Sequence, residues 1–494
     1  MTKTILYTAV LISWTNIQTR AQTFTPISQN NLSGIYATIS NPALAVGGID
    51  KFSFNLVGAG VGIQNNALRS DLDYELVRVV SKRPFTLEPG SLDNIGVEVH
   101  RKQVLKPRIY ANADALQLAA QVAIGKKLSV FVYSRERGFI NFDKGDYHSL
   151  KYLAEEKYNH KEPLVKLGFD ARSITYQEIG VGLAAEVYNK RKNYLKAGFT
   201  YKRLNGRSIF AMNIPEFESK LQNNGIGVTA EMNIIKTTLD FAAQNPLDFI
   251  LRPDIGQGTA IDLGFVYEHR PYNLKHTYRK NNPKKKNKVF NRRNLVKYDY
   301  RFGVSLLDAG KITYNKKAVT VNEYRLNTHF SPEDLAEMTG DDYAQSILDS
   351  ATLTSNNRDV IVELPTTVVL QYDQRLLKGW FLGVNYTQNI RKNKLASIYV
   401  PSNLQVQIRK ETEHCVFGFP TLIVPSTRTY TLGAYAQTGP FFIGTQNIGT
   451  LFLKKIYNPS FYAGLVCNIR YKKDSNIENH KSFKTRRTPS YWKY

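Results

Sequence analysis

Long stretches of the chain alternate between apolar residues and polar or small residues, which is typical of a β-strand with two different faces. In the segment 380–389, large apolar side chains recur at every second position, and glycine, asparagine and threonine stand between them. Segments 258–267, 429–437 and 461–472 repeat this pattern. The sequence therefore predicts an all-β protein.

Further segments with the same period bring the expected number of strands to about 14. These segments are 51–64, 116–125, 128–141, 173–188, 194–204, 296–307 and 360–376. Many of them exceed the roughly 5–6 residues that are common in soluble sheets. They reach the roughly 9–11 residues that a tilted strand needs to cross a bilayer.

The predicted connections differ strongly in length. Residues 125–127 form a short turn, and Asn205-Gly206 is a strong hairpin signal after 194–204, whereas other connections are long and charged. Tight turns on one side and long loops on the other are typical of outer-membrane barrels. Aromatic residues at the predicted strand ends fit the girdles of such barrels. They are Tyr176, Tyr188, Tyr267, Tyr372, Trp380 and Tyr386.

These patterns favour a closed antiparallel transmembrane-type β-barrel of about 14 strands with short loop helices. A soluble β-sandwich would show a similar alternation and stays open as an alternative. Two loop segments have helical spacing, one at 331–348, where Ser331 and Pro332 provide a helix start, and a weaker one at 146–158.

The N-terminus has the features of a secretory signal peptide over residues 1–21. Lys3 precedes a short apolar stretch at 5–14, and small residues at Thr19 and Ala21 form a cleavage site before Gln22. The apolar stretch is too short to cross a bilayer as a helix. A buried N-terminal strand is the alternative. We therefore expect export and a location in the cell outer membrane.

The remaining chain divides into an N-terminal segment 22–50, a β-barrel 51–472 and a basic tail 473–494. The N-terminal segment is a candidate plug, because alternating glycines leave one face of the first strand without side chains and let another backbone approach closely. The candidate plug contacts are Asn41, Pro42, Gly58, Gly60 and Gly62.

Composition adds a strongly basic character. The chain has 494 residues, with 66 Lys+Arg against 41 Asp+Glu and a formal charge of +25. A hydrophobic content of 42% excludes disorder as the main state, and two cysteines exclude a disulfide scaffold. The basic residues concentrate in the segment 270–297 and in the tail, and we expect the strands to carry comparatively little charge.

The basic segment predicts contact with anionic headgroups of outer-membrane lipid or lipopolysaccharide, or with an acidic partner. A solvated loop without a partner is the alternative. Nucleic acid is not an expected partner, because the chain is exported and lacks an organised recognition motif. The candidate headgroup contacts are Lys280, Lys284, Lys285, Lys286, Lys288, Arg292 and Arg293.

The sequence shows no catalytic, cofactor or metal motif. None of the eight histidines is spaced as a metal-ligand pair. Residues 180–185 match the sequence of a dinucleotide-binding fingerprint, but strand alternation continues through them, whereas the fingerprint requires a turn into a helix. Glu268-His269, at a predicted strand end, is the one pair that a barrel hydrolase could use. We expect a protein that is not an enzyme.

Several segments resemble known families. Residues 40–45 (SNPALA) resemble the start of exported barrels such as the long-chain fatty-acid transporter group. Segments 196–206, 302–314, 364–367 and 438–444 resemble a family of exported Bacteroidota barrels that carry a domain of unknown function. This resemblance covers nearly all of the mature chain, and it implies an outer-membrane β-barrel without an assigned activity.

The leading hypothesis is an integral outer-membrane barrel without catalysis. It would act as a channel, as a transporter of small or hydrophobic solutes, or as an anchor in a surface assembly with protein partners. The alternative is a soluble exported β-protein that binds polyanions through 270–297. A barrel hydrolase is a third hypothesis.

Overall fold

The computed structural model describes residues 24–71, 96–99, 106–145, 164–190, 192–222, 224–237, 255–270, 277–282, 285–291, 296–331, 351–377, 379–391, 394–453 and 455–471. Within these ranges, no helix is long and apolar enough to span a membrane. The predicted signal peptide 1–21 and the tail 473–494 lie outside the described residues. The helix predicted at 146–158 and all but Ser331 of the helix at 331–348 also lie outside them.

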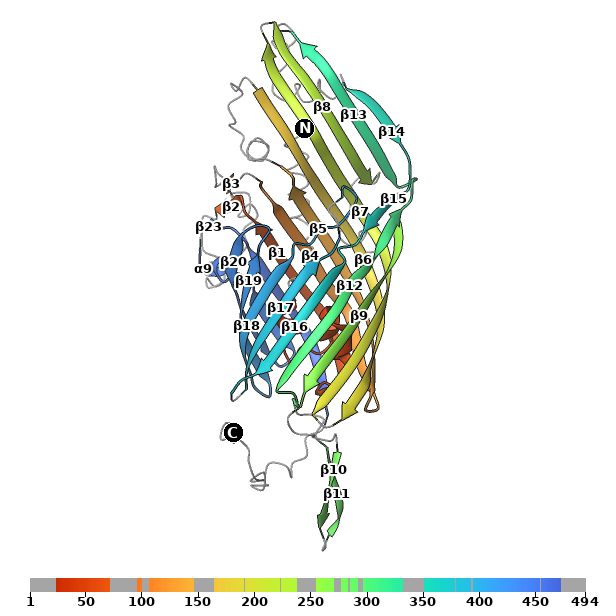
Figure 1. Cartoon of the computed structure of the whole chain (residues 1–494), viewed down its shortest axis with the longest axis vertical. Coiled ribbons are helices and arrows are strands. Elements are labelled where there is room, and N and C mark those ends of the chain that lie inside the picture. The colour runs from red at the N-terminus through yellow and green to blue at the C-terminus, as the bar shows by residue number, and fades with distance from the viewer. Residues whose placement is uncertain are drawn as a thin grey trace, which may run out of the picture.

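The wall of the molecule is a closed, 14-strand antiparallel barrel, as the alternation predicted (Figure 1). The first strand pairs with the last, so that the sheet has no free edge around the wall. Two wall positions are each built from two short strands in succession, β15 with β16 and β20 with β21. In chain order the strands are β1 (Asp50–Asn65), β4 (Ile109–Ile124), β5 (Leu128–Asp143), β6 (Leu164–Lys190), β7 (Asn193–Gln222), β9 (Gly256–His269), β12 (Tyr300–Tyr314), β15 (Val360–Glu363), β16 (Thr367–Arg375), β17 (Trp380–Asn389), β18 (Asn403–Glu411), β19 (Cys415–Val424), β20 (Thr429–Leu432), β21 (Ala434–Thr438), β22 (Phe441–Thr445) and β24 (Ser460–Arg470).

Strands β6 and β7 are longer than the wall and extend beyond it as a sheet at one end (Figure 1). The far half of β7 pairs with β8 (Gly225–Thr237), which pairs with β13 (Val319–Phe330), and β13 pairs with β14 (Thr352–Asn356).

The predicted hairpin at Asn205-Gly206 is wrong, because both residues lie inside β7. The strand pairs with β9 up to Gly206 and with β8 from Phe210, so that the chain changes its partner here instead of its direction. A register shift opposite Gly206 accommodates the change, and Gly206 itself packs against the ring of Tyr314. Pairing of β6 with β7 on both sides of Gly206 therefore outweighs the local turn preference of Asn205-Gly206.

The remaining short strands and helices are not part of the wall. Strands β10 and β11 form a two-stranded hairpin, and β2, β3 and β23 form a three-stranded sheet. Among the described residues, three short helices precede β1, and one follows β22. The bounds are α2 (Thr25–Ser28), α3 (Tyr36–Ser40), η1 (Pro42–Ala45), β2 (Leu68–Asp71), β3 (Gly96–Val99), β10 (Thr277–Asn282), β11 (Lys285–Asn291), α9 (Gly449–Phe452) and β23 (Lys455–Ile456).

The two ends of the barrel differ in their connections. At one end, which we call the turn rim, β1 begins, β24 ends, and five connections have only two to four residues: 125–127, 191–192, 376–379, 412–414 and 439–440. The opposite end is the loop rim. The prediction of short turns on one side is confirmed with one exception, because the 30-residue connection 270–299 also leaves from the turn rim.

The barrel is apolar outside and polar inside. Outward side chains such as Val181, Phe265 and Phe419 are more than half exposed, whereas the inward Asp114 and Arg409 are fully buried. This arrangement is the inverse of a soluble protein and matches the apolar belt of an outer-membrane barrel. The architecture is therefore an outer-membrane-type barrel and not the β-sandwich that the alternation also allowed.

The predicted aromatic ends are only partly right. Tyr188 and Trp380 point outward near the turn rim, at 44% and 40% exposed, as an interfacial girdle requires. Tyr176, in contrast, is fully buried inside the barrel, and β6 begins at Leu164, nine residues before the predicted start at Ser173. Tyr176 lies near the middle of a long strand and cannot mark its end.

Candidate functional site in the barrel lumen

The chain segment before β1 lies inside the barrel, where Figure 1 shows its short helices between the strands. We call residues 24–49 the plug. Its side chains Phe24, Ile27, Ile35 and Tyr36 are almost fully buried, and they pack in one cluster with inward residues from strands on several sides of the wall. These wall residues include Leu116, Phe131, Tyr133, Ala184, Val416, Tyr435, Phe442, Tyr462 and Val466.

Hydrogen bonds hold the plug from all around the lumen. The donors and acceptors on the wall belong to β1, β4, β7, β12, β18 and β21, which together surround the segment. The bonds join Tyr36 Oη to Asn55 Oδ1 (2.8 Å), Gln121 Nε2 to the Ala45 carbonyl (2.8 Å), Lys196 Nζ to the Val46 carbonyl (3.0 Å), Ser305 Oγ to the Ser40 carbonyl (2.8 Å), Asn31 Nδ2 to Glu411 Oε2 (2.8 Å) and Asn30 Nδ2 to Gln437 Oε1 (3.0 Å).

The glycines of β1 stand in different surroundings. Gly58 faces Tyr36 of the plug so closely that a Cβ atom would overlap the tyrosine hydroxyl. Gly60 pairs with Asp114 and Tyr462 on the neighbouring strands. Gly62 lies nearer the loop rim, where a Cβ would meet Ser460. Of the three glycines, Gly58 is therefore the one with a defined plug contact.

Asn41 and Pro42 lie against a different part of the wall from the β1 glycines. Asn41 accepts a hydrogen bond from the Ala43 N–H (3.1 Å) and starts η1. Its side chain occupies the space over Gly264 of β9, and Pro42 and Ala43 lie over Gly198 of β7. Gly198 and Gly264 were not among the predicted plug contacts, although both stand on the polar or small face of an alternating strand.

A layer of buried charges lies on the inner face of the wall, between the plug and the loop rim. We call it the ion-pair layer, and its members are Asp114, Arg135, Arg137, Glu178, Lys202, Asp262 and Asp308, all less than a tenth exposed. Their ion pairs are Arg135 with Asp114, Arg135 with Glu178 (3.1 Å), Arg137 with Asp308 (2.8 Å), and Lys202 with Asp262 and Asp308 (2.7 Å each).

One member of the ion-pair layer depends on a backbone irregularity. Asp308 lies where the pairing of β12 with β9 shifts register, and its φ is +58°. Its backbone N–H donates to Asp262 Oδ1 (2.8 Å), and its side chain meets Arg137 and Lys202. The bulge thus directs the carboxylate of Asp308 into the lumen, whereas regular alternation along β12 would place this side chain on the outer face.

The expectation that the strands carry little charge is wrong. Arg135 and Arg137 stand two residues apart, so they share the inward face of β5. Glu178 lies on the inward face of β6. Charges that fall on the small or polar face of an alternating strand were a usable signal.

The loop-rim half of the lumen is filled by apolar side chains and by residues 394–402, which we call the inward loop. Ile398 and Val400 of this loop are buried among wall residues that include Phe139, Ile174 and Val362. Two further bonds reach across to the far wall, from Asn141 Nδ2 to the Tyr399 carbonyl (2.8 Å) and from Arg172 Nη1 to the Lys394 carbonyl (2.7 Å). The connection between two adjacent strands therefore closes the barrel from its other end.

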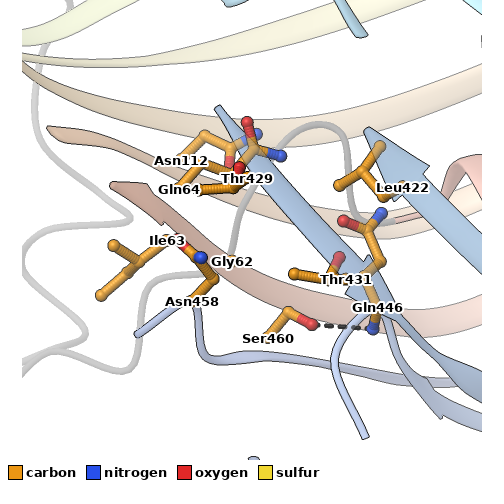
Figure 2. A pocket seen from close by; sticks show the side chains of 10 residues that line it. All are labelled: Gly62, Ile63, Gln64, Asn112, Leu422, Thr429, Thr431, Gln446, Asn458 and Ser460. Atoms are coloured by element: carbon orange, nitrogen blue, oxygen red, sulfur yellow. Dashed lines mark hydrogen bonds between the residues drawn. The ribbon is translucent and has the colours of Figure 1, made fainter. Parts of the chain in front are cut away.

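Little free space is left between these groups. Figure 2 shows a small polar cavity near the loop rim, of about 10 Å³, where the Gln446 N–H donates to Ser460 Oγ (2.7 Å). A second cavity of about 60 Å³ lies at the turn rim between the plug and the wall. The first holds about one water molecule and the second a few. Among the described residues, the plug and the inward loop therefore occupy much of the lumen.

Comparisons with known proteins place the chain in a family. A family model described as a family of unknown function, DUF5723, matches residues 42–446, which is most of the chain. The chain belongs to the DUF5723 family. A comparison with curated proteins gives no match.

Solved outer-membrane barrels are similar to this DUF5723 member over most of their length. The toluene transporter TbuX of Ralstonia pickettii is 9% identical, with 93% of this chain and 100% of that chain covered and a TM-score of 0.37. A mutant of the monoaromatic hydrocarbon channel TodX is 8% identical, with 89% and 95% covered and a TM-score of 0.41. The outer-membrane protease OmpT of Escherichia coli is 8% identical, with 85% and 97% covered and a TM-score of 0.21.

The pair that a hydrolase could use does not come together in the DUF5723 member. Glu268 points into the lumen and contacts Lys196 and Arg270, whereas His269, the next residue of β9, stacks on the ring of Tyr300 with centroids 4.9 Å apart. Successive strand residues face opposite sides of the wall. Among the residues that the structure describes, no three His, Cys, Asp or Glu side chains are grouped to hold a metal ion.

The predicted headgroup contacts are only partly described. Lys280 lies in β10, and Lys285, Lys286 and Lys288 lie in β11, with Lys280 directly opposite Lys288 in the hairpin register. Lys284, Arg292 and Arg293 lie outside the described residues.

Two tyrosines of the plug region act as neutral donors. Burial, together with the nearby carboxylate of Asp114, raises the pKa of Tyr36 well above its usual value. Burial also raises the pKa of Tyr298, which lies just before β12 and donates to Asp373 Oδ2 (2.6 Å) and to Asn31 Oδ1 (3.0 Å). Both hydroxyls therefore keep their protons, and their hydrogen bonds persist, across the physiological pH range.

Proposed function

We propose that this protein is a non-enzymatic channel or transporter of the outer membrane, in which the plug is the closed gate. One observation carries the proposal. The plug fills the turn-rim half of a barrel whose exterior is apolar, and the backbone ladder that closes the wall joins β1 directly to β24. The inner wall also carries the buried charges of the ion-pair layer, which a purely apolar core would not contain and which solute passage could use.

The attachment of the plug is compatible with movement. The segment continues into the wall only at Asp50, and most of its polar contacts are single hydrogen bonds from amide and hydroxyl side chains. Each such bond contributes about 1 kcal/mol net, because water replaces it when it breaks. The plug can therefore leave its place without breaking the barrel ladder.

A reversible crosslink tests the gate. Cys415 and Cys467 are first replaced by serine, and then Asn30→Cys and Gln437→Cys place two thiols where side chains already meet at 3.0 Å. In planar bilayers with potassium chloride, the oxidised protein should show no channel openings, and a reductant should restore them. The single variant Asn30→Cys is the control.

Equal current from the oxidised and the reduced protein, with the crosslink verified by mass, would contradict the gate. A protein that conducts in neither state, also after removal of the plug, would contradict the channel and favour the predicted anchor in a surface assembly.

We further propose that the basic connection 270–299 binds anionic phospholipid headgroups. It leaves from the turn rim, and the side of short turns is the periplasmic side in outer-membrane barrels. Lipopolysaccharide, the other predicted partner, belongs to the opposite leaflet, so the fold supports a phospholipid instead. Replacing the basic residues 279–288 with glutamine should weaken flotation with phosphatidylglycerol vesicles, while phosphatidylcholine vesicles serve as the control.

The export route belongs to the same proposal. Cleavage after Ala21 would leave Gln22 as the first residue, two positions before the plug begins at Phe24. Mass spectrometry of the membrane-extracted protein tests this, and an uncleaved N-terminus would contradict it. The Bacteroidota origin and the relation of the SNPALA segment to the fatty-acid transporter group stay predictions.

A further inference from the structure

The cavity of about 60 Å³ at the turn rim has an unusual charge balance. It lies at the junction of the plug with β7, β9 and β12, and it is lined by Lys196, Glu268, Arg270, Lys297 and Arg301 among other residues. Four of these five side chains are basic. Lys196, Glu268 and Arg270 are each at most 5% exposed.

Two of these cations share one carboxylate. Lys196 Nζ lies 2.6 Å from Glu268 Oε1, and Arg270 Nη2 lies 2.5 Å from Glu268 Oε2. Arg270 also covers the ring of Tyr194 at 3.4 Å, which fixes the guanidinium against the cavity wall. Burial of a charge without an equal counter-charge is costly, so this cluster favours an additional anion.

Two further charges of the cavity lie beside opposite charges. Arg301 pairs with Asp373 (3.1 Å), and Asp50, the second carboxylate of the lining, lies 3.9 Å from Arg470. The excess of positive charge is therefore localised at Lys196 and Arg270, beside the free volume. That volume is sized for an oxyanion group rather than for a larger solute.

We propose that this cavity binds a phosphate or carboxylate group, with Arg270 and Lys196 as its cationic ligands. Arg270 supplies planar N–H donors that suit a bidentate oxyanion contact, and Lys196 supplies a point charge. Because Lys196 also donates to the Val46 carbonyl of the plug, a bound anion adds a bridge between the wall and the plug. The binding itself does not depend on whether the barrel conducts solutes.

The test compares Arg270→Gln with the unchanged protein. Arg270→Gln leaves Lys196 and Glu268 as a balanced pair and leaves the contact with Val46 in place, so the variant should fold. Lys127→Gln is the matched control, since Lys127 is an exposed cation of the short turn 125–127 at the same rim. The readout is calorimetric binding of inorganic phosphate and of acetate to the full-length protein in detergent, with sodium chloride at equal ionic strength as the reference.

The unchanged protein and Lys127→Gln should bind phosphate or acetate with one site per chain. Arg270→Gln should bind it about tenfold to a hundredfold more weakly, because a hydrogen bond to a charged group contributes a factor of that size. Equal binding by all three proteins would overturn the proposal.

A second arm distinguishes a free anion from a lipid phosphate. If soluble phosphate and acetate give no heat, the three proteins are reconstituted into phosphatidylglycerol and phosphatidylcholine vesicles, and their thermal unfolding is compared. A stabilisation by phosphatidylglycerol that Arg270→Gln loses identifies a lipid headgroup as the ligand. The absence of a difference that depends on Arg270 in both arms would reject the site.

Discussion

The two halves of the lumen are filled in different ways. The turn-rim half holds the plug, a segment that precedes the wall in sequence and is fixed largely by side-chain hydrogen bonds. The loop-rim half holds the inward loop 394–402, which connects two neighbouring wall strands and packs Ile398 and Val400 into an apolar cluster. One closure is a separate piece of chain that combines hydrogen bonds with a buried apolar cluster, and the other is part of the wall and also combines apolar packing with hydrogen bonds.

This difference shows which closure is able to move. Hydrogen bonds to the plug can be exchanged for bonds to water at little net change in free energy. Exposing apolar side chains to water costs about 25 cal/mol per Å² in either half, but the plug joins the wall only at Asp50, whereas the inward loop joins it at both ends. We therefore assign gating to the turn-rim half and structural closure to the loop-rim half.

Deleting the plug should give the largest change in channel current. A variant without residues 24–48 should keep the barrel but lose its turn-rim closure, because the β1–β24 pairing does not involve the plug. The test measures channel current in planar bilayers, and heat-modifiable gel mobility verifies that the barrel has formed. A folded variant that stays closed would show that the inward loop alone seals the lumen.

Removing the central cation of the ion-pair layer should be the largest point effect on stability. Lys202→Met leaves Asp262 and Asp308 without their 2.7 Å partner, and breaking a buried ion pair from one side costs about 3–5 kcal/mol. Thermal unfolding in detergent measures the loss, with Lys202→Arg as the charge-preserving control. An unchanged melting temperature would mean that the layer is hydrated and not a barrier between the halves.

Truncating the inward loop should destabilise the barrel without opening the plug. Ile398→Ala removes a side chain that is 1% exposed, and such truncations cost about 2–5 kcal/mol. The melting temperature should fall, while the Asn30–Gln437 crosslink should still form at the unchanged rate. If Ile398→Ala instead raises the channel current, the assignment of the two halves has to be reversed.

The smallest effect is expected from a single plug hydrogen bond. Tyr36→Phe removes the hydroxyl that donates to Asn55 and keeps the ring against Gly58. The loss of about 1 kcal/mol should raise the frequency of channel openings about fivefold. Since burial holds the pKa of Tyr36 far above neutrality, this difference from the unchanged protein should be constant between pH 6 and about 8.

Local pattern predicted the wall well, because alternation and strand length are properties of each segment. The strands at 128–141, 380–389 and 461–472 were placed within a few residues of β5, β17 and β24. The prediction failed where two signals competed, as at Asn205-Gly206, since a turn dipeptide carries no information about the partner strands around it. The plug was anticipated as a segment, but most of its wall contacts were not.

The sequence by itself determined that this protein is built of long strands with one apolar face and one polar or small face, since both follow from the period of two along each strand. Only the tertiary structure decided which charges meet. Lys196, Glu268 and Arg270 come from two strands, and Asp114 and Asp308 lie almost two hundred residues apart in one layer. Closure of the sheet brings such residues together, and the register that does so is a property of the whole ring of strands.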